Sequence, residues 1–534
     1  QHSNTSVLGS SFHPTNLIDR HSRVSLGRSR VNPVIMKTST VQDDKNVGIL
    51  AMEVYTPRCF VKQSALEQHN GIPSGKYTIG LGQEALGLIT GDVEDINSIC
   101  LTVVHNLLEK YQIDPKSVGR LEIGTETLVD KSKSTKTVLM QLFPDNTDME
   151  GATVVNACYG GTSALLNAFY WCESSAWNWN DDGAVYAIVV AADIAVYDNG
   201  AARPTSGAGA VAFLVGRDAP IAFQPQARAT HAQHTWDFFK PDHSVEYPTV
   251  DGKLSQVCYY QAIEDCYERY CAKMDKIAKA VDDEKGYDFD ATTPDYWVFH
   301  SPYNKLVQKS YARLFLMDER RRHQKAKTTT LKEDWLTKPI QETYVDKELE
   351  KALKQLSSAD YQQRLNDANA ASVAVGNTYA ASVFLGLASL IDRTSMSLRE
   401  GKTIVMFSYG SGSMATMYTF RIRSAAKNTQ FSCQRMADRM KLTQRLTTRE
   451  EVDPAELDWA LETRAKMHRA GAPYQPIYPT VGRLFPGTYY LTGIDSEWKR
   501  TYSRVPLDAA VEKSADGYLF LAPTSVRDEA SASE

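Results

Sequence analysis

The chain has 534 residues, which is enough for two to four domain-sized units. Hydrophobic residues make up 43% and charged residues 23%, an ordinary composition for a soluble globular protein. The formal net charge of −5 gives no basic surface for nucleic acid, and no apolar run approaches the roughly 18–20 residues that cross a bilayer. We therefore expect a soluble protein without nucleic-acid or membrane partners.

The two ends of the chain differ in composition from the rest. Residues 1–45 form a predicted disordered N-terminal extension, and residues 523–534 a predicted disordered tail. The first 35 residues are rich in arginine and serine and poor in acids, as in a mitochondrial transit peptide, but they lack a persuasive apolar helical face. We expect Met36 to be the true start. We expect a cytoplasmic protein, with a mitochondrial location as the alternative.

Ordered sequence begins with an apolar strand over 46–57, followed by a helix over 94–111 with apolar residues three and four apart. Further strands are predicted at 118–127, 153–161, 183–197 and 207–216, with a helix at 162–174. After a polar stretch, helices are expected at 263–281 and 304–316, and strands at 295–303 and in two parts of 403–423. Near-continuous apolar strands that alternate with helices predict an α/β fold whose sheets are covered on both faces.

The eight cysteines form no C-x-x-C pair and no secreted disulfide framework, so a reducing compartment fits best. His231 and His234 stand three residues apart without a third ligand nearby in the sequence. We therefore predict no metal site.

Cys158 stands in "VVNACYGGTSALLNAFYW", between a strand and a helical pattern. A buried structural cysteine before a glycine turn is one interpretation, because cysteine is often buried. The other is a nucleophile, since the N–H groups at a helix start stabilise a thiolate and could bind an oxyanion. Gly160 and Gly161 would leave room for a substrate near the backbone.

His300, in "VFHSPYNKLVQKS", takes a similar place at the end of a buried strand. Lys305 and Lys309 follow one helical turn apart and could present two cations to an anionic ligand. A hydrogen-bonded core histidine and a solvated helix face are the alternatives. Glu126, in "IGTET", has no evident partner in the sequence.

Several long stretches, taken in order, identify the chain as similar to the eukaryotic 3-hydroxy-3-methylglutaryl-coenzyme A (HMG-CoA) synthases. They are "GKYTIGLGQ", "EDINS", "RLEIGTETLVDKSKSTKT", "NACYGGT", "DIAVY", "ARPTSGAGAVA", "DFFKPD", "YPTVDGKLS", "FHSPYNKLVQKS", "FSYGSG" and "GTYYLTGID". The resemblance runs from about Asn46 to Pro506.

This resemblance implies a thiolase-like fold, with two related halves in αβαβα layers and a homodimer. The halves would be residues 46–220, which carry the nucleophile, and residues 221–522, which carry the histidine and the CoA-binding elements. The implied reaction joins acetyl-CoA, acetoacetyl-CoA and water to give (3S)-HMG-CoA and CoA in the mevalonate pathway, with CoA thioesters as substrates and no cofactor.

The resemblance also implies roles for individual residues. Cys158 would carry the acetyl group, Glu126 would remove a proton from it, and His300 would polarise the ketone of acetoacetyl-CoA. Further substrate or CoA contacts would come from Thr205, Ser255, Lys305, Lys309, Asn377, Ser411, Pro73 and Ser74. Asp193, Asp237 and Tyr379 would support these groups. Ala201 replaces an asparagine that is frequent in animal members, and Pro73-Ser74 replace an Asp-Ala pair.

Two other functions remain open. A different thiolase-fold enzyme, a thiolase or a ketoacyl synthase, would use Cys158 without Glu126 as base. A binding or scaffold protein that kept the fold would not accept an acetyl group at Cys158.

Overall fold

A computed structural model describes residues 45–175, 177, 185–281, 289–398, 400–423, 430–477, 481–508, 511–513 and 519–521. All of them belong to one compact unit, residues 43–534. The predicted disordered end segments, 1–45 and 523–534, lie outside the described residues except for Lys45. None of the described helices is long and apolar enough to span a membrane.

A large mixed sheet contains nine strands in the order β11-β12-β13-β8-β1-β7-β6-β4-β5. Their bounds are β1 Gly48–Tyr55, β4 Val118–Gly124, β5 Thr153–Val154, β6 Tyr186–Ala195, β7 Gly207–Gly216, β8 Ile221–Ala232, β11 Tyr296–Phe299, β12 Thr403–Gly410 and β13 Met414–Ile422.

The sheet has two parts that meet at β1 and β8, which pair through Gly48↔Ala222 and Ile49↔Ile221. In the first part β4 and β6 are parallel, and β6–β7 and β7–β1 are antiparallel. The second part repeats this sequence, since β11 and β12 are parallel and β12–β13 and β13–β8 are antiparallel. The end of β4, before Glu126, therefore corresponds to the end of β11, before His300.

The described part of the chain also contains smaller sheets and the helices. Further strands are β2 Cys59–Lys62, β3 Ala85–Leu88, β9 Phe238–Phe239, β10 Thr249–Val250, β14 Glu450–Glu451, β15 Tyr489–Ile494, β16 Arg500–Arg504, β17 Val511–Lys513 and β18 Leu519–Leu521. The helices are α1 Gln63–His69, α2 Ile96–Tyr111, α3 Thr135–Leu139, α4 Gly160–Glu173, α5 Gly252–Val281, α6 Asn304–Gln324, α7 Glu333–Thr337, α8 Lys347–Arg364, α9 Asn366–Val375, α10 Ser382–Thr394, α11 Cys433–Met440, α12 Leu442–Thr447 and α13 Pro454–Arg469. Short 3₁₀ helices lie at Pro115–Ser117, Met140–Leu142, Arg203–Thr205, Ile340–Tyr344, Tyr379–Ala381 and Val481–Arg483.

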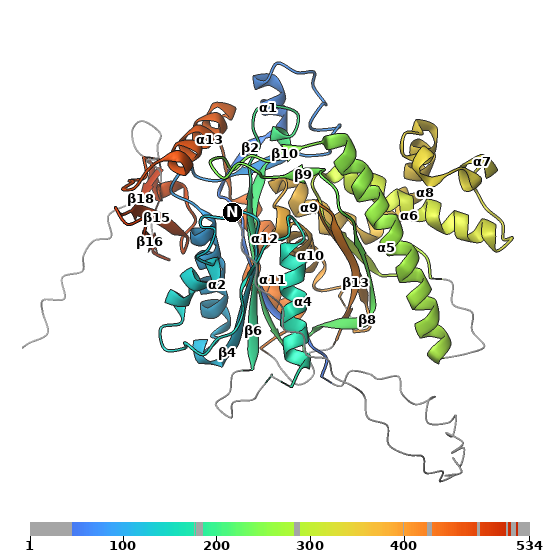
Figure 1. Cartoon of the computed structure of the whole chain (residues 1–534), viewed down its shortest axis with the longest axis horizontal. Coiled ribbons are helices and arrows are strands. Elements are labelled where there is room, and N and C mark those ends of the chain that lie inside the picture. The colour runs from blue at the N-terminus through green and yellow to red at the C-terminus, as the bar shows by residue number, and fades with distance from the viewer. Residues whose placement is uncertain are drawn as a thin grey trace, which may run out of the picture. The chain divides into compact units, whose positions relative to one another are not determined.

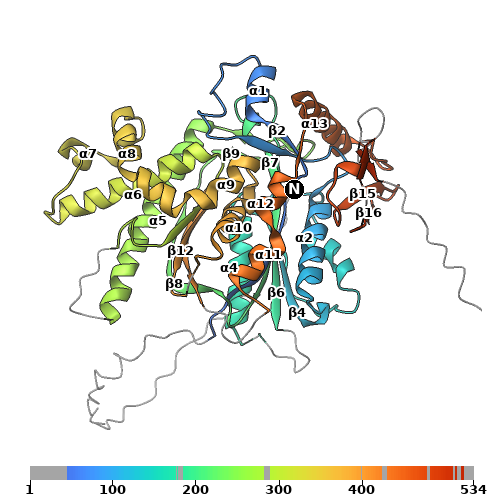
Figure 2. The ribbon, with the colours of Figure 1, turned by 180° about the vertical axis from the view of Figure 1, so that it is seen from behind.

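Helices and sheet parts form five layers. Helix α2 covers the outer face of the first part, α4 and α10 lie between the two parts, and α5 covers the outer face of the second part. Figure 1 shows α2, β6, α4, β8 and α5 in this order from left to right, and Figure 2 shows α10 in the middle from behind. This αβαβα order is the one that the resemblance implies.

The alternation of side chains along the strands produces these layers, because successive side chains of a strand point to opposite faces. In β7, Ala212 and Leu214 pack into the α2 core, whereas Phe213 and Val215 pack into the central core. Each face is apolar, so the strand is buried throughout. Such strands read as continuous hydrophobic runs in the sequence.

Helix α2 explains why the motif "EDINS" has its residues. Asp95 caps the helix by accepting a hydrogen bond from Ser98 N–H (2.9 Å), and Ser98 Oγ in turn accepts from Asp95 N–H (3.0 Å). Arg500 and the Tyr502 hydroxyl, both on β16, bind the second oxygen of Asp95 at 2.8 and 2.9 Å. One carboxylate therefore starts the helix and attaches the β15–β16 hairpin to it.

The predicted α/β class is confirmed, and the strands expected near 118–127, 183–197, 207–216, 295–303 and 403–423 are present. The predicted helices at 263–281 and 304–316 are parts of longer ones, α5 and α6. The polar stretch before them contains a twelve-residue strand, β8, that the sequence pattern did not reveal. The division of the chain at residue 220 stays a prediction.

Candidate active site

Cys158 lies on the turn that joins β5 to α4. Ala157, directly before it, has a φ of +41°, which is unfavourable for a residue other than glycine. A hydrogen bond from Tyr159 N–H to Asn156 O (2.9 Å) closes the turn. Gly410, at the end of β12, packs against it so closely that a Cβ there would lie 2.6 Å from Tyr159 N. Both halves of the sheet therefore hold the cysteine turn in a strained conformation.

The two glycines after Cys158 serve packing and leave no room for a substrate, contrary to the expectation from the sequence. A Cβ on Gly161 would lie 2.6 Å from Ala191 Cβ and 2.7 Å from Ala380 O. A Cβ on Gly160 would lie 3.0 Å from a carbonyl oxygen of β5. Glycine is needed at both positions because α4 approaches the sheet and the turn before α10 closely.

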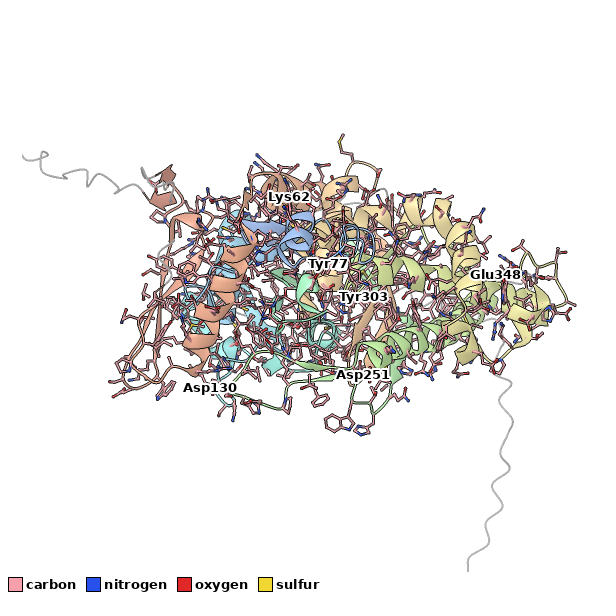
Figure 3. The ribbon with its side chains drawn as sticks, turned by 90° about the horizontal axis from the view of Figure 1, so that it is seen from above. Lys62, Tyr77, Asp130, Asp251, Tyr303 and Glu348 are labelled. Atoms are coloured by element: carbon pink, nitrogen blue, oxygen red, sulfur yellow. The ribbon has the colours of Figure 1, made fainter. Side chains whose placement is uncertain are left out.

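One cavity of about 520 Å³ is lined by residues from both halves of the sheet. Seven predicted site residues line it: Cys158, Thr205, Ser255, His300, Asn377, Tyr379 and Ser411. Tyr303, which also lines the cavity, is labelled near the centre of Figure 3, with Tyr77 and Asp251 on either side. The structure thus brings the predicted nucleophile and the predicted histidine to one cavity.

The surroundings of Cys158 favour the neutral thiol. The residue is 8% exposed, and burial raises the pKa of its thiol well above the ordinary value. The negative charges of Glu126 and Asp193 raise this pKa further, and the positive charge of Lys240 lowers it to a smaller extent. The backbone N–H of Cys158 does lower this pKa, as expected at the start of a helix, but burial and the two carboxylates outweigh its effect. The thiol proton has to leave as the sulfur attacks.

Glu126 follows β4 and lines a second cavity, of about 310 Å³, together with Ala157 and Lys240. Phe238 lines both cavities. Glu126 therefore lies behind the cysteine turn and not on the wall that holds His300. Its carboxylate is nevertheless close enough to act on the charge of the Cys158 sulfur.

Asp193, at the end of β6, holds the loop of Glu126 in place. Its Oδ1 accepts hydrogen bonds from Glu126 N–H and Thr127 N–H (2.9 Å each) and from the hydroxyls of Thr125 and Thr127 (2.8 Å each). Its Oδ2 accepts from Ala380 N–H (2.8 Å). One buried carboxylate thus joins the Glu126 loop to the turn before α10.

Opposing effects set the pKa of the Asp193 carboxyl group. Burial and the negative charge of Glu126 raise the pKa of Asp193 to about 7, whereas Lys240 and the donated hydrogen bonds lower it. Asp193 is not among the residues that line the cavity with Cys158. We conclude that Asp193 positions backbone and leaves contact with substrate to others.

His300 follows β11 and is held through its backbone. Its N–H donates to Phe407 O (2.8 Å), and its carbonyl accepts from the Tyr259 hydroxyl (2.6 Å). The Tyr409 ring stacks on the imidazole with 6.5 Å between centroids, and Nδ1 has no hydrogen-bond partner among the described residues. Burial lowers the pKa of His300 to about 3, so the ring is neutral near pH 7 and can donate one N–H.

We expect His300 to make the protein less stable in acid. A histidine in the unfolded chain has a pKa of about 6.5, whereas the pKa of His300 is about 3 in the fold. Between these pH values the unfolded chain binds one more proton than the folded chain. The free energy of unfolding is therefore unaffected by His300 above pH 6.5 and falls as the pH drops, by about 2 kcal/mol at pH 5. Urea unfolding at pH 7.5 and 5.0 measures how much free energy of unfolding is lost between the two pH values. This loss should be smaller in His300→Gln than in the wild type by about 2 kcal/mol. An equal loss in both proteins would contradict a buried neutral histidine.

Asn377 and Tyr379 form one wall of the cavity with Thr205. Asn377 N–H donates to Thr205 O (3.0 Å), and Asn377 Oδ1 accepts from Tyr379 N–H (2.9 Å). Tyr379 has a φ of +41° and packs edge-to-face on Tyr197, with 5.9 Å between ring centroids. Two strained non-glycine residues, Ala157 and Tyr379, therefore lie at this site, where such strain is often found.

Ser411 and Ser255 lie on the cavity, and Asp237 lies beneath them. Ser411 is in the turn between β12 and β13, and Ser255 is in the first turn of α5. Asp237 is fully buried, and it accepts hydrogen bonds from Gly412 N–H (2.9 Å) and the Tyr409 hydroxyl (3.0 Å). Asp237 therefore fixes the turn of Ser411.

Lys305 and Lys309 lie on α6 beside the cavity and do not line it, whereas Leu306 does. Lys309 Nζ is 3.1 Å from Glu350, an ion pair that reduces its charge toward a ligand. Burial and the positive charges of Lys354 and Lys309 lower the pKa of Lys305. Three lysines thus lie close together near the cavity, and their contact with CoA stays a prediction.

Pro73 and Ser74 lie in an exposed turn and line neither cavity. The buried carboxylate of Glu67 holds the chain just after them, accepting for example from Tyr77 N–H (2.7 Å). Leu81, farther along this loop, does line the cavity. The structure therefore does not bring Pro73 and Ser74 into the site, although the loop that follows them reaches it.

Sequence reasoning gave no role to several residues of the site. Tyr197, Tyr259 and Tyr409 line the cavity, but single tyrosines in apolar segments are typical of any core. Lys240 forms an ion pair with Glu126, with 2.8 Å between Nζ and Oε1. The sequence feature that could have indicated Lys240 is the motif "DFFKPD", in which an acidic and a basic residue flank two aromatic residues.

Comparisons with known proteins agree with this geometry. Two family models match, hydroxymethylglutaryl-coenzyme A synthase N terminal over residues 43–220 and C terminal over residues 221–505. The chain is 43% identical over 469 residues to hydroxymethylglutaryl-CoA synthase A of Dictyostelium discoideum, which covers 88% of this chain and 92% of that protein. It is 45% identical over 468 residues to the human synthase named cytoplasmic, with 86% and 88% covered.

Among solved structures, MvaS in complex with 3-hydroxy-3-methylglutaryl coenzyme A has a TM-score of 0.71 and 28% identity. The match covers 86% of this chain and 99% of that chain. The expected thiolase-like fold is thereby confirmed. The family models cover nearly all described residues, and the relatives match over most of their own length. The chain belongs to the hydroxymethylglutaryl-CoA synthase family.

Proposed function

We propose that this chain condenses acetyl-CoA with acetoacetyl-CoA and water to give (3S)-3-hydroxy-3-methylglutaryl-CoA and CoA. The observation that carries this proposal is that Cys158 and His300, from opposite halves of the sheet, line one cavity, with the Glu126 charge acting on the sulfur. The human relative carries the synthase name, and MvaS, at 28% identity, binds HMG-CoA. Both support a CoA thioester as the ligand of the cavity.

In the first step Cys158 accepts the acetyl group. Its sulfur forms a bond to the carbonyl carbon of acetyl-CoA, and the bond from that carbon to the CoA sulfur breaks. The thiol proton, which the surroundings hold on the sulfur, passes to the departing CoA thiolate. Free CoA leaves, and an acetyl thioester remains on Cys158.

In the second step the acetyl group becomes a carbon nucleophile. Glu126 takes a proton from the acetyl methyl group, and the resulting enolate attacks C3 of acetoacetyl-CoA. The neutral imidazole of His300 donates a hydrogen bond to the ketone oxygen, where negative charge develops. That oxygen then takes the proton held by Glu126.

In the last step water cleaves the thioester that joins the product to Cys158. The carbonyl carbon becomes the free carboxylate of the product, one proton of the water goes to the sulfur, which leaves as the thiol, and the other proton is released to solvent. The active site thereby returns to its starting protonation. We propose no cofactor beyond these CoA thioesters.

Labelled acetyl-CoA tests the proposal directly. Without the second substrate, we expect the peptide that contains Cys158 to gain the mass of one acetyl group. Addition of acetoacetyl-CoA should then release the label as HMG-CoA. A scaffold protein would take up no label, and a label that acetoacetyl-CoA does not remove would contradict the condensation.

Location and assembly are further parts of the proposal. The human relative is named cytoplasmic, which supports a cytoplasmic location for this chain. We also propose a homodimer. Its support is that β5 lies at an edge of the sheet and that Val155, just after β5, is 55% exposed. Light scattering after size-exclusion chromatography would reveal a monomer if this is wrong.

A further inference from the structure

We propose that Lys240 is a positioning residue, which holds the Glu126 carboxylate by one oxygen so that the other is available to take the methyl proton. The inference rests on the proposed function, because it assigns Glu126 the role of base. Lys240 itself contacts no reacting atom in this proposal.

The first support is the contact itself. Lys240 Nζ lies 2.8 Å from Glu126 Oε1, and the two side chains are 21% and 5% exposed. Both carboxylate oxygens are buried and neither accepts a hydrogen bond of normal geometry from the described residues, so the ion pair with Lys240 is the contact of Oε1, and Oε2 is left without a partner. A buried polar atom without a partner is costly, and functional sites are among the places where such an atom persists. The contact thus leaves one acceptor of the carboxylate unused.

The second support is the rigid placement of Lys240. It directly follows β9, which pairs with β10 through Phe238↔Val250. Asp237, at the start of this segment, is anchored by hydrogen bonds from Gly412 N–H and the Tyr409 hydroxyl. Phe238 and Val250 line the large cavity. The segment that forms the cavity wall therefore also places the ammonium group behind that wall.

The third support is the set of charges around Lys240. Burial alone would lower the pKa of Lys240, but the carboxylates of Glu126, Asp193 and Glu246 more than offset it, so the pKa lies above its ordinary value. Glu246 is itself paired with Arg464 at 2.7 Å. Asp242, His243 and His468 line the same cavity as the lysine. Lys240 thus stays charged at neutral pH.

The Tyr379 ring completes this arrangement. Lys240 Nζ lies 4.8 Å from its centroid, within the range of a cation–π interaction. Tyr379 also lines the large cavity. Ammonium, aromatic ring and carboxylate therefore form one cluster between the cysteine turn and the turn before α10.

The test compares Lys240→Met, which removes the charge, with Lys240→Arg, which keeps it. Without the positive charge a proton binds more tightly to the neighbouring carboxylates. We expect the acid limb of the kcat–pH profile of Lys240→Met to move up by about one to two pH units. We expect kcat at pH 6.5 to fall at least about tenfold, with Lys240→Arg close to wild type in the position of the limb. Lys240→Gln is the second uncharged variant if the methionine variant does not fold.

Lys62→Met is the matched control, because Lys62, which is labelled in Figure 3, forms an exposed ion pair with Glu451 at 2.6 Å. It should leave the profile unchanged. An unchanged profile in Lys240→Met, or a loss that is equal at every pH and is not rescued by arginine, would overturn the inference. If wild type itself formed no HMG-CoA, the proposed function would fail, which the same assay shows separately.

Discussion

Replacement of Cys158 by alanine is expected to lower kcat by at least about 10⁴-fold, the scale on which loss of a catalytic nucleophile acts. The variant should also take up no label from acetyl-CoA. Both results follow because the acetyl group has no other attachment site in this proposal. Turnover with acetyl-CoA and acetoacetyl-CoA, together with peptide mass analysis, measures them.

Cys172→Ala is the matched control for this variant. Cys172 lies on α4, the helix that Cys158 precedes, but it packs into the central core and lines neither cavity. We expect its loss to lower stability and to leave the acetylation of Cys158 intact. If Cys158→Ala kept more than a hundredth of the wild-type kcat, the covalent route would be wrong.

The strands and their chemistry could be predicted because the information is local. β11 is a short apolar run that His300 follows directly, and β4 is a mainly apolar segment, interrupted by Arg120 and Glu122, that ends two residues before Glu126. Residues at the carboxyl ends of strands meet at one edge of an α/β sheet. The approximate neighbourhood of these residues therefore follows from the sequence pattern.

β8 could not be predicted because only one of its faces is buried along most of its length. From Ala227 onward buried and exposed residues alternate, and Gln224, Pro225 and Gln226 lie in its middle. The segment therefore looks polar, and its identity as a strand depends on pairing with β13 and β1. Such pairing joins distant parts of the chain, which no local pattern encodes.

The protonation and charge of the groups at the site also depend on contacts between distant parts of the chain. A cysteine at a helix start predicts a thiol with a lowered pKa and hence a thiolate. In the structure, burial and the charges of Glu126 and Asp193 raise the pKa of the Cys158 thiol instead. Likewise, Lys309 looks like a free cation in the sequence, yet it is paired with Glu350 on α8. Charge is set by the whole environment of a group, and the sequence gives only its type.

Replacement of Glu126 by glutamine is expected to separate the two chemical steps. The amide keeps the size of the side chain but cannot take a proton, so condensation should slow by about 10²- to 10⁴-fold. Acetylation of Cys158 should remain, since the Glu126 charge raises the pKa of the thiol and its loss does not hinder attack. Quenched-flow measurement of acetyl-enzyme and HMG-CoA resolves the two rates.

Asp130→Asn provides the control, because Asp130 lies exposed on the loop that follows Glu126 (Figure 3). Its Oδ1 accepts from Ser132 N–H (2.7 Å) and Lys133 N–H (2.6 Å), which asparagine can also do, so both steps should proceed at the wild-type rate. A thiolase or ketoacyl synthase that does not use Glu126 as base would condense its substrates without this carboxylate. Full condensation by Glu126→Gln would therefore assign the base to another group, and equal loss of both steps would make Glu126 a structural residue of the site.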